Sequence, residues 1–408
     1  MISLKRRNFL KNALVFAAYT AAASELRAAG DDTPAEKPAG FKVLPYLQNP
    51  RPDGMTVMWH TEMNAYGWIE YGESHELGNM ADLVIDGLRN ANTILHKVSL
   101  ENLKPGHVYY YRACFKRIKK FGPYAVDFDA TISSPVYSFR TISEQANSVK
   151  CALFNDIHRN FDVFGQLAKR FSDRECEFTF FNGDCFPDYS DDDGMLAAMD
   201  LYNRGTQGYS YPMIHIRGNH ETRGAFARGF KAKLDFPEGQ YYFAMSAGPV
   251  RFIVLDCGED KDDSNKAYSG LNDFSGFRAR QAEWLKREIK SDGFLNAKFR
   301  VLVHHIPLYQ RSDRGISAFS RKLWEPVLND APIDLAVCGH IHRYNYVPVG
   351  EAGNLYPVIV GGGPNKSGTL IIMDANAKEL KLEVLDVNGN RIGHYAKSVG
   401  GDMKILDV

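Results

Sequence analysis

Between residues 156 and 342 the chain carries five short clusters of carboxylate, amide and imidazole side chains. In order, they are Asp156-Ile157-His158, Gly183-Asp184, Gly218-Asn219-His220-Glu221, His304-His305 and Gly339-His340-Ile341-His342. Mixed carboxylate and imidazole donors suit Zn, Mn, Fe or Ni better than a purely oxygen-lined site would. One Asp-x-His or His-x-His pair alone fits a solvated strand end equally well. Five such clusters in series predict a site for two metal ions.

Nearly every cluster directly follows an apolar run that is typical of a buried strand. These runs occupy residues 151–154, 178–181, 213–216, 299–303 and 335–338. In layered α/β domains, ligands collect beyond the carboxyl ends of the strands. In extended backbone, residues two apart point to the same side, so both members of an Asp-x-His or His-x-His pair can face one metal centre. A carboxylate such as Asp184 can bridge two cations about 4 Å apart.

The rest of the chain predicts two structural regions. Residues 41–143 contain short β-branched and aromatic runs separated by Gly, Pro, Asn and Asp, which predicts an all-β sandwich. A polar segment follows, and from residue 148 to about 402 strand-like runs alternate with helical patterns such as 161–171 and 280–289. This second pattern predicts an α/β domain with two packed sheets.

The first thirty residues have the pattern of an export signal. A basic segment from Lys5 to Lys11 precedes an apolar run at 13–23 and small residues up to Gly30, and Arg6-Arg7 is similar to the twin-arginine signal. The apolar run is too short to span a bilayer comfortably. We therefore expect an exported protein, periplasmic or secreted, with no stable membrane anchor. The cleavage position is left open.

Charge and cysteine content exclude some classes of partner. Lys plus Arg and Asp plus Glu both count 49, so no global field favours nucleic acid, and a small substrate held by local groups is expected. The six cysteines stand in or beside strand-like runs, which favours buried free thiols over a disulfide framework. Nothing in the sequence indicates an oligomeric state.

In their order and types, the five clusters resemble those of the calcineurin-like binuclear metallophosphoesterase superfamily. With the all-β region in front, the layout resembles the purple acid phosphatases, and Leu103-Lys104-Pro105-Gly106 before a tyrosine-rich strand resembles a fibronectin type III-like module. The resemblance implies a four-layer α/β/β/α catalytic domain. It also implies metal-dependent hydrolysis of phosphate monoesters or diesters, with a metal-bridging hydroxide as the nucleophile.

The same resemblance implies which residues bind two divalent or trivalent transition metals, with Fe, Mn or Zn expected. For the first metal the implied ligands are Asp156, His158 and His342, and for the second Asn219, His304 and His340. The bridging ligand is Asp184, which also counts among the catalytic residues.

Three further residues receive roles near the substrate. The resemblance implies that His220 acts on the substrate as general acid or charge stabiliser and that Glu221 orients His220. His305 is left between a substrate contact and local packing, and a one-residue slip between His304 and His305 as the ligand stays open.

Two departures from the purple acid phosphatase pattern shift these expectations. That family has Asp-x-Gly where this chain has Asp156-Ile157-His158, and a tyrosine ligand where this chain has Pro187. Without the tyrosinate we predict a protein that is not purple. The first metal site is similar to that of phosphodiesterase and nucleotidase members, so nucleotidase or cyclic phosphodiesterase specificity is one alternative. A catalytically inert surface binding protein is the other, with glycan or protein held by aromatic residues such as Trp59 and Trp68.

Overall fold

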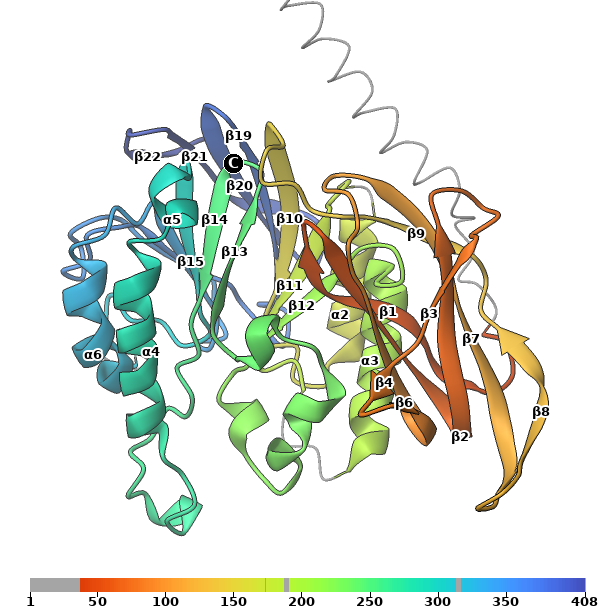
Figure 1. Ribbon diagram of the computed structural model, residues 1–408. Helices are drawn as coiled ribbons and strands as arrows, with labels where there is room; N and C mark the ends of the chain where they lie inside the picture. Colours follow the sequence, from red (N-terminus) through yellow and green to blue (C-terminus); the bar gives the residue numbers. More distant parts are fainter. Residues whose placement is uncertain (1–36, 173, 187–190, 313–316, 408) are drawn as a thin grey trace, which may run out of the picture.

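A β-rich N-terminal region and an α/β region make up the computed structural model (Figure 1). The structure describes residues 37–172, 174–186, 191–312 and 317–407. The expected order of an all-β region followed by an α/β region is confirmed. The expected export signal at residues 1–30 lies outside the described residues.

The N-terminal strands are joined through one long strand that is paired along both of its halves. The strands are β1 (Phe41–Arg51), β2 (Gly54–Gly72), β3 (Asn79–Ala81), β4 (Val84–Ile85), β5 (Leu88–Arg89), β6 (Ala91–Leu100), β7 (Val108–Phe121), β8 (Val126–Ser133) and β9 (Tyr137–Arg140). The first half of β2 pairs with β1 and β6, and its second half pairs mainly with β7 and β3. The register shifts between His60 and Ala65, where β2 passes from one set of partners to the other. Trp59, Ile69 and Tyr111 are buried in the core of this region.

Two sheets form the centre of the α/β region. The first has the order β12-β11-β10-β19-β20-β21-β22 and the second the order β13-β14-β15-β16-β18-β17. The strands of the first sheet are β10 (Ser148–Phe154), β11 (Phe178–Asn182), β12 (Met213–Ile216), β19 (Thr369–Asn376), β20 (Glu379–Asp386), β21 (Arg391–Ser398) and β22 (Met403–Ile405). Those of the second are β13 (Phe243–Ala247), β14 (Val250–Val254), β15 (Phe299–Val303), β16 (Leu335–Cys338), β17 (Asn345–Val347) and β18 (Val358–Val360).

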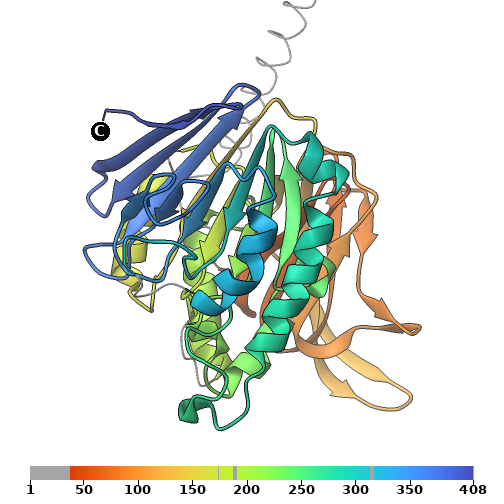
Figure 2. The same ribbon diagram turned by 90° about the vertical axis from the view of Figure 1, so that its left-hand side faces the viewer.

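Helices cover the outer face of each sheet. The α-helices are α2 (Phe161–Phe171), α3 (Asp192–Thr206), α4 (Phe274–Glu288), α5 (Asp292–Asn296) and α6 (Ala318–Leu328). Short 3-10 helices lie at η1 (His220–Thr222), η2 (Phe226–Arg228), η3 (Phe230–Lys233), η4 (Pro237–Gly239) and η5 (Lys266–Tyr268). Helices α2 and α3 lie on the first sheet, and α4 and α6 on the second, in front of it in Figure 2. The four-layer α/β/β/α prediction is therefore confirmed.

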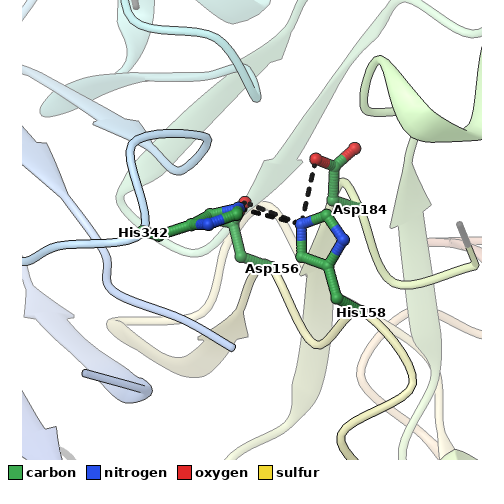
Figure 3. A group of neighbouring side chains, drawn as sticks. All are labelled: Asp156, His158, Asp184 and His342. Carbon is green, nitrogen blue, oxygen red and sulfur yellow. Dashed lines mark hydrogen bonds and ion pairs between the residues drawn. The ribbon is translucent and has the colours of Figure 1, made fainter. Parts of the chain in front are cut away.

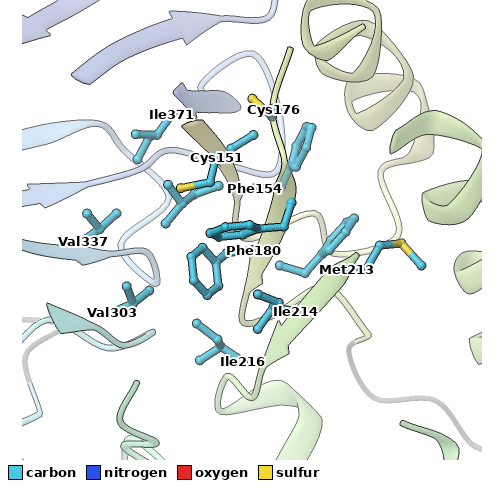
Figure 4. Packing of buried hydrophobic residues seen from close by; sticks show 14 of the residues in the cluster. Cys151, Phe154, Cys176, Phe180, Met213, Ile214, Ile216, Val303, Val337 and Ile371 are labelled. Atoms are coloured by element: carbon cyan, nitrogen blue, oxygen red, sulfur yellow. The ribbon is translucent and has the colours of Figure 1, made fainter. Parts of the chain in front are cut away.

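Helix α2 illustrates how local sequence produces these layers. The Asn160 side chain accepts a hydrogen bond from the backbone N–H of Val163 and so caps the first turn. Phe164, Leu167 and Phe171 recur at helical spacing and are buried against the first sheet. Between the two sheets, side chains from both inner faces form the main core (Figure 4).

The N-terminal region shares this core. Val43, Tyr46 and Met58 belong to the same buried cluster as the strands of the α/β sheets. Polar contacts reinforce the junction, because the backbone N–H of Leu47 donates to the carbonyl of Gly208 at 2.8 Å, and Gln48 Nε2 donates to the carbonyl of Met213 at 2.8 Å. The two regions are therefore packed as one body.

All six cysteines are free and buried, as the sequence predicts. Among the described residues, the helices are too short or too polar to cross a membrane.

Candidate metal centre

The candidate site lies where strands of both sheets end. Strands β10, β11 and β12 run parallel in the first sheet, and β15 and β16 run parallel in the second, so their carboxyl ends meet at one edge. Each of the five clusters begins within two residues after one of these strands. The expectation that strand ends position the clusters is correct.

A first group of donor atoms comprises Asp156, His158, Asp184 and His342, whose donor atoms all lie within 4.8 Å of one another (Figure 3). The Nε2 atoms of His158 and His342 are 2.9 Å apart. His158 Nε2 lies 3.3 Å from Asp184 Oδ2, and His342 Nε2 lies 3.4 Å from Asp156 Oδ1. These are the four residues expected around the first metal.

A second group shares Asp184 with the first and adds His305 and His340. His305 Nε2 lies 3.1 Å from Asp184 Oδ2, the same carboxylate oxygen that faces His158. Asn219 lies beside this group, because its Oδ1 is 2.9 Å from Nδ1 of His340. Asp184 is thus the carboxylate common to both groups, which is the position expected for a bridging ligand.

Of the two adjacent histidines, the structure places His305 and not His304 among the donor atoms, which favours the one-residue slip that the sequence left open. The His304 ring turns into the core, where its Nδ1 is 2.8 Å from the carbonyl of Ile306 and 3.6 Å from the Cys338 sulfur. His305 Nδ1 donates to the carbonyl of Asn182 at 2.8 Å, so Nε2 is the nitrogen that faces Asp184. Consecutive residues point to opposite sides, and the sequence alone does not show which of them faces the site.

The pairs two residues apart do not reach the site through extended backbone. Asp156, His158, Asp184, His340 and His342 all have positive φ, between 46° and 74°. This left-handed region is uncommon for residues other than glycine, although Asn, Asp and His adopt it more often than other types, and five such residues at one site indicate a functional constraint. His342 lies in the first group and His340 in the second, which is the division that the resemblance implied.

Glycines beside the clusters make room for the donor side chains. A Cβ on Gly183 would lie 2.3 Å from Nδ1 of His305, and Gly183 also has a φ of +81°. A Cβ on Gly218 would lie 2.3 Å from Oδ1 of Asp184. Only glycine allows these close approaches.

Glu221 does not orient His220, which corrects a second expectation. Its buried carboxylate instead accepts backbone N–H groups from both neighbouring loops: those of Asp184 at 2.9 Å, Cys185 at 2.7 Å, Phe186 at 2.7 Å and Gly218 at 2.9 Å. Hydrogen bonds to a carboxylate are stronger than neutral ones. Glu221 therefore fixes the loop that carries the shared Asp184 against the loop that carries Asn219.

Backbone contacts also select which carboxylate oxygens face the two groups. The N–H of His340 donates to Asp156 Oδ2 at 2.8 Å, and the N–H of His220 donates to Asp184 Oδ1 at 2.9 Å. The other oxygen of each carboxylate, Asp156 Oδ1 and Asp184 Oδ2, is left to face the imidazoles. Each loop thus orients a donor that another loop carries.

The two buried carboxylates of the site favour positive charge close to them. Burial lowers the pKa of His158 and of His305, but Asp156 and Asp184 outweigh it and raise the pKa of His158 to about 9 and that of His305 to about 10. Burial raises the pKa of Asp184, but the imidazoles, His305 first, lower it well below its usual range. Burial and His305 lower the pKa of His340 to about 4. Two buried carboxylates thus attract protons, and metal ions compete for the same donors.

The donor set fits transition metal ions. Asp156 Oδ1 and His305 Nε2 are buried, face the two groups and have no hydrogen-bond partner. Donors held about 2.1 Å from a six-coordinate cation lie about 3.0 Å apart when they are adjacent, and the contacts among these donors range from 2.9 to 3.8 Å. A cation in each group would satisfy atoms that are otherwise orphaned.

The open side of the site is marked by His342, His220 and His158, whose side chains are 44%, 26% and 14% exposed. His220 Nε2 lies 4.0 Å from Asp184 Oδ2, close enough to face a molecule held on both groups. Beside it lies Arg223, whose Nη1 is 3.0 Å from His220 Nε2. In the sequence Arg223 stands near a cluster, but nothing there indicates this contact.

Other neighbours of the clusters have structural contacts. Tyr309 is buried and donates its hydroxyl to Glu325, so it does not face the site. Asn160 caps α2, and the glycine loop at 361–363 packs under the site, where Asn155 Nδ2 donates to the carbonyl of Gly362 at 3.0 Å. Position 187 lies outside the described residues, so the absence of purple colour stays a prediction.

Two comparisons of the sequence with protein families agree with this geometry. Residues 149–344 match the family described as calcineurin-like phosphoesterase, and residues 42–141 match the one described as purple acid phosphatase, N-terminal domain. The chain carries a calcineurin-like metallophosphoesterase domain. The metallophosphoesterase match contains all five clusters.

Individual relatives are distant. The chain is 22% identical to purple acid phosphatase 15 of Arabidopsis thaliana, over 74% of this chain and 60% of that protein. It is 20% identical to purple acid phosphatase 23 of the same plant, over 67% of this chain and 66% of that protein. The chain therefore spans less than two thirds of the length of both relatives.

Two solved structures share the fold. Purple acid phosphatase PPD1 from yellow lupin (Lupinus luteus) seeds has a TM-score of 0.64 at 15% identity, covering 87% of this chain and 74% of that one. A structure of PhoD has a TM-score of 0.62 at 12% identity, covering 91% of this chain and 93% of that chain. The likeness extends over both the β-rich and the α/β regions.

Proposed function

We propose that this protein is a binuclear metal-dependent hydrolase of phosphate esters. One observation carries the proposal: Asp184 Oδ2 belongs to both groups of donor atoms. It lies 3.3 Å from His158 Nε2 in the first group and 3.1 Å from His305 Nε2 in the second. A carboxylate shared in this way would hold two cations close enough together to act on one phosphate.

The proposed ligands follow from the geometry. Asp156, His158 and His342 would hold one metal, Asn219, His305 and His340 the other, and Asp184 both. The imidazole and carboxylate donors support Fe, Mn or Zn as the ions. When bound, such a metal pair supplies an activated water molecule and neutralises charge on the phosphate oxygens.

The chain's own residues supply the remaining steps. Glu221 and the backbone N–H groups of His220 and His340 keep the carboxylates in place before substrate arrives. The exposed faces of His342 and His220 would receive the ester. His220 would then give a proton to the leaving oxygen, or a hydrogen bond that stabilises its charge.

The proposal is tested by phosphate release after loading with Mn, Zn, Fe or Ni. We expect hydrolysis of p-nitrophenyl phosphate or its bis ester, lost in Asp184→Ala. His220→Ala should keep both metals but lower kcat by about 10²–10⁴-fold. Full activity in Asp184→Ala would contradict the proposal.

The alternatives have less support. Nucleotidase or cyclic phosphodiesterase specificity concerns the same site, and a substrate screen across nucleotides, sugar phosphates and diesters separates these classes. An inert binding protein would have no reason to keep a complete donor set. Absence of bound transition metal from the purified protein would favour it.

The proposed organisation comprises an export signal at 1–30, a fibronectin type III-like region at 41–143 and a catalytic region at 148–402. Expression with and without the first thirty residues, followed by cell fractionation, tests export. Retention of the full-length chain in the cytoplasm would contradict it.

A further inference from the structure

Strands β7 and β8 form a hairpin whose outer end projects from the N-terminal region. Strand β9 pairs with the start of β7, and β2 pairs with β7 only as far as Arg117, so beyond this residue the two strands pair with each other alone. In both ribbon views this end stands clear of the other elements (Figures 1 and 2). A two-stranded hairpin without a third strand or a packed face is marginally stable in water. A surface that covered the end of the hairpin would therefore stabilise it.

The end of the hairpin exposes large apolar side chains. Tyr124 at the turn is fully exposed, Phe121 is 55% exposed and Phe128 is 40% exposed. In the register of the two strands, Ile118 lies opposite Phe128 and Phe121 lies opposite Val126. Residues directly opposite each other point to the same side of a hairpin, so each pair combines two apolar side chains. These five residues, called the hairpin tip below, form an exposed apolar group of the kind that marks an interaction surface.

Cationic side chains flank the hairpin tip. Those on β7 are Lys116, Arg117, Lys119 and Lys120, and the carboxylates on β8 are Asp127 and Asp129. Lys119 Nζ lies 2.6 Å from Asp129, and Arg117 Nε lies 3.5 Å from the same carboxylate. Within the part of the chain that the structure describes, Lys116 and Lys120 form no ion pair. The hairpin end is thus locally positive, although the charges of the whole chain balance.

We propose that the hairpin tip and its neighbouring lysines dock on the surface of an anionic lipid bilayer. The aromatic and aliphatic side chains enter the boundary between headgroups and acyl chains, and the lysine amines stay at the level of the headgroup phosphates. Anionic headgroups attract the net positive charge of the hairpin end. This role goes beyond the proposed hydrolase function, because the hairpin tip contains none of the metal donors.

A second copy of the chain is the competing occupant. Strand β8 is the last strand in its sheet order, so its outer edge could pair with a strand of another molecule. The size of the hairpin tip argues against this, because its five apolar residues are few beside the roughly 20–30 residues that each partner contributes to a stable interface. Charge argues against it too, since two copies would bring equal positive charges together, whereas anionic lipid attracts them.

The first test measures binding of the full chain to large unilamellar vesicles by co-sedimentation. One set of vesicles contains phosphatidylglycerol mixed with phosphatidylcholine, and the other contains phosphatidylcholine alone. We expect binding to the anionic vesicles that is at least about tenfold stronger than to the neutral ones and that weakens as salt is added. Phe121→Ser combined with Tyr124→Ser should weaken binding to anionic vesicles at least about tenfold. Lys116→Gln combined with Lys120→Gln should do so by about tenfold, and only on anionic vesicles.

A second measurement reports whether the hairpin tip itself enters the bilayer. Tyr124→Trp places an indole at a fully exposed position. On addition of anionic vesicles its emission should shift to shorter wavelength, and lipids brominated in their acyl chains should quench it. The spectrum of the unsubstituted protein, which has four tryptophans of its own, is subtracted. All variants keep the first thirty residues, so any binding by that segment is common to all of them.

Matched controls remove exposed side chains elsewhere. Leu355→Ser removes an apolar side chain that is 58% exposed, and Lys298→Gln combined with Lys378→Gln removes two exposed charges. Both should bind vesicles as the unsubstituted protein does. Tm and metal content are measured for every variant, and the hairpin variants should stay folded and keep both metals.

Four outcomes would overturn the inference. The first is a lack of binding to anionic vesicles, and the second is equal binding by the hairpin variants and the controls. The third is an unchanged emission of Tyr124→Trp on bound vesicles. The fourth is a dimer in light scattering that Phe121→Ser with Tyr124→Ser dissociates, which would assign the hairpin tip to a second copy. None of these outcomes alters metal content or phosphate release, so the proposed hydrolase function is tested separately.

Discussion

The Nε2 atoms of His158 and His342 lie 2.9 Å apart although the residues are separated by 184 positions in the sequence. Two imidazole lone pairs at that distance repel unless a proton or a cation lies between them. The carboxylates of Asp156 and Asp184 lie beside the pair and favour positive charge there. The pair is therefore best explained as half of a coordination shell.

The number of metal ions bound per chain should depend on Asp184 more than on any other ligand. We expect two transition metals per chain in the wild type, about one in His342→Ala and none in Asp184→Ala, because only Asp184 belongs to both groups. Elemental analysis of the purified variants measures this. Asp374→Ala, which removes a half-exposed carboxylate from β19, is the control and should keep two. Two metals in Asp184→Ala would be incompatible with a bridging role.

The neighbouring histidines should behave differently on truncation. His305→Ala is expected to lose the metal of the second group and the activity. His304→Ala should keep both metals but lower the free energy of unfolding by about 2 kcal/mol, because it leaves a gap between Cys257 and Cys338 and an unpaired carbonyl. Metal content together with urea denaturation distinguishes them. The reverse pattern would restore His304 as the ligand.

Glu221→Gln should weaken metal binding without removing any ligand. An amide nitrogen in place of a carboxylate oxygen would confront the backbone N–H groups of Asp184 and Gly218, or of Cys185 and Phe186, depending on its orientation. We expect metal affinity to fall by about 10–100-fold in competition with a chelator.

The control for Glu221 is Glu288→Gln, which removes a buried carboxylate paired with Arg251 at 2.8 Å, away from the site. It should lower Tm but leave metal affinity as in the wild type. Equal affinity losses in both variants would mean that Glu221 acts only through global stability.

Gly183→Ala should disrupt the site more than backbone strain alone explains. Gly183 and Gly270 have similar positive φ, +81° and +74°, so alanine costs about 1–2 kcal/mol of strain at either position. Only at Gly183 does the new Cβ meet a donor, His305 Nδ1 at 2.3 Å, whereas nothing lies within 4 Å at Gly270. We expect loss of the second metal in Gly183→Ala and full metal content in Gly270→Ala. Full metal content in both would argue against a steric role for Gly183.

Acid should destabilise the fold through the buried histidines of the N-terminal region. Burial lowers the pKa of His96 to about 4, while an unfolded histidine titrates near about 6.5. The unfolded state therefore binds the proton first, and stability that is fully present above about pH 6.5 falls by up to about 1.4 kcal/mol per pH unit down to about pH 4.

Urea denaturation at pH 7.5 and 5.5 measures this effect. The difference between the two pH values should be smaller in His96→Gln than in the wild type by about 1 kcal/mol. His75→Gln, which removes an exposed histidine, should keep the wild-type difference. An unchanged pH dependence in His96→Gln would contradict the assignment.

The sequence predicted the site's composition better than its geometry. Apolar runs followed by ligand types were enough to place five clusters at strand ends, because strand burial and the parallel arrangement are both encoded locally. The φ angles could not be predicted from the sequence, because contacts between loops impose the left-handed backbone at Asp156, His158 and His340. The same contacts decide that His305 rather than His304 faces Asp184.

Glu221 and Arg223 show a second limit of the sequence. Both stand beside Asn219 and His220, and position alone suggests that each serves its immediate neighbour. The structure shows that Glu221 serves a loop 35–37 residues away, and that Arg223 depends on Glu259, 36 residues away. Partners at such distances are set by the layer packing and not by local pattern.

Val43, Tyr46 and Met58 of the N-terminal region are buried in the core of the α/β sheets, and this limits where the chain can be divided. A gene fragment that starts at the first strand of the catalytic region would leave an apolar face of its first sheet and α3 open to water. Such a fragment would be prone to aggregate even with all its metal ligands intact. Any domain that replaced the N-terminal region would therefore have to supply apolar side chains in the places of these three residues.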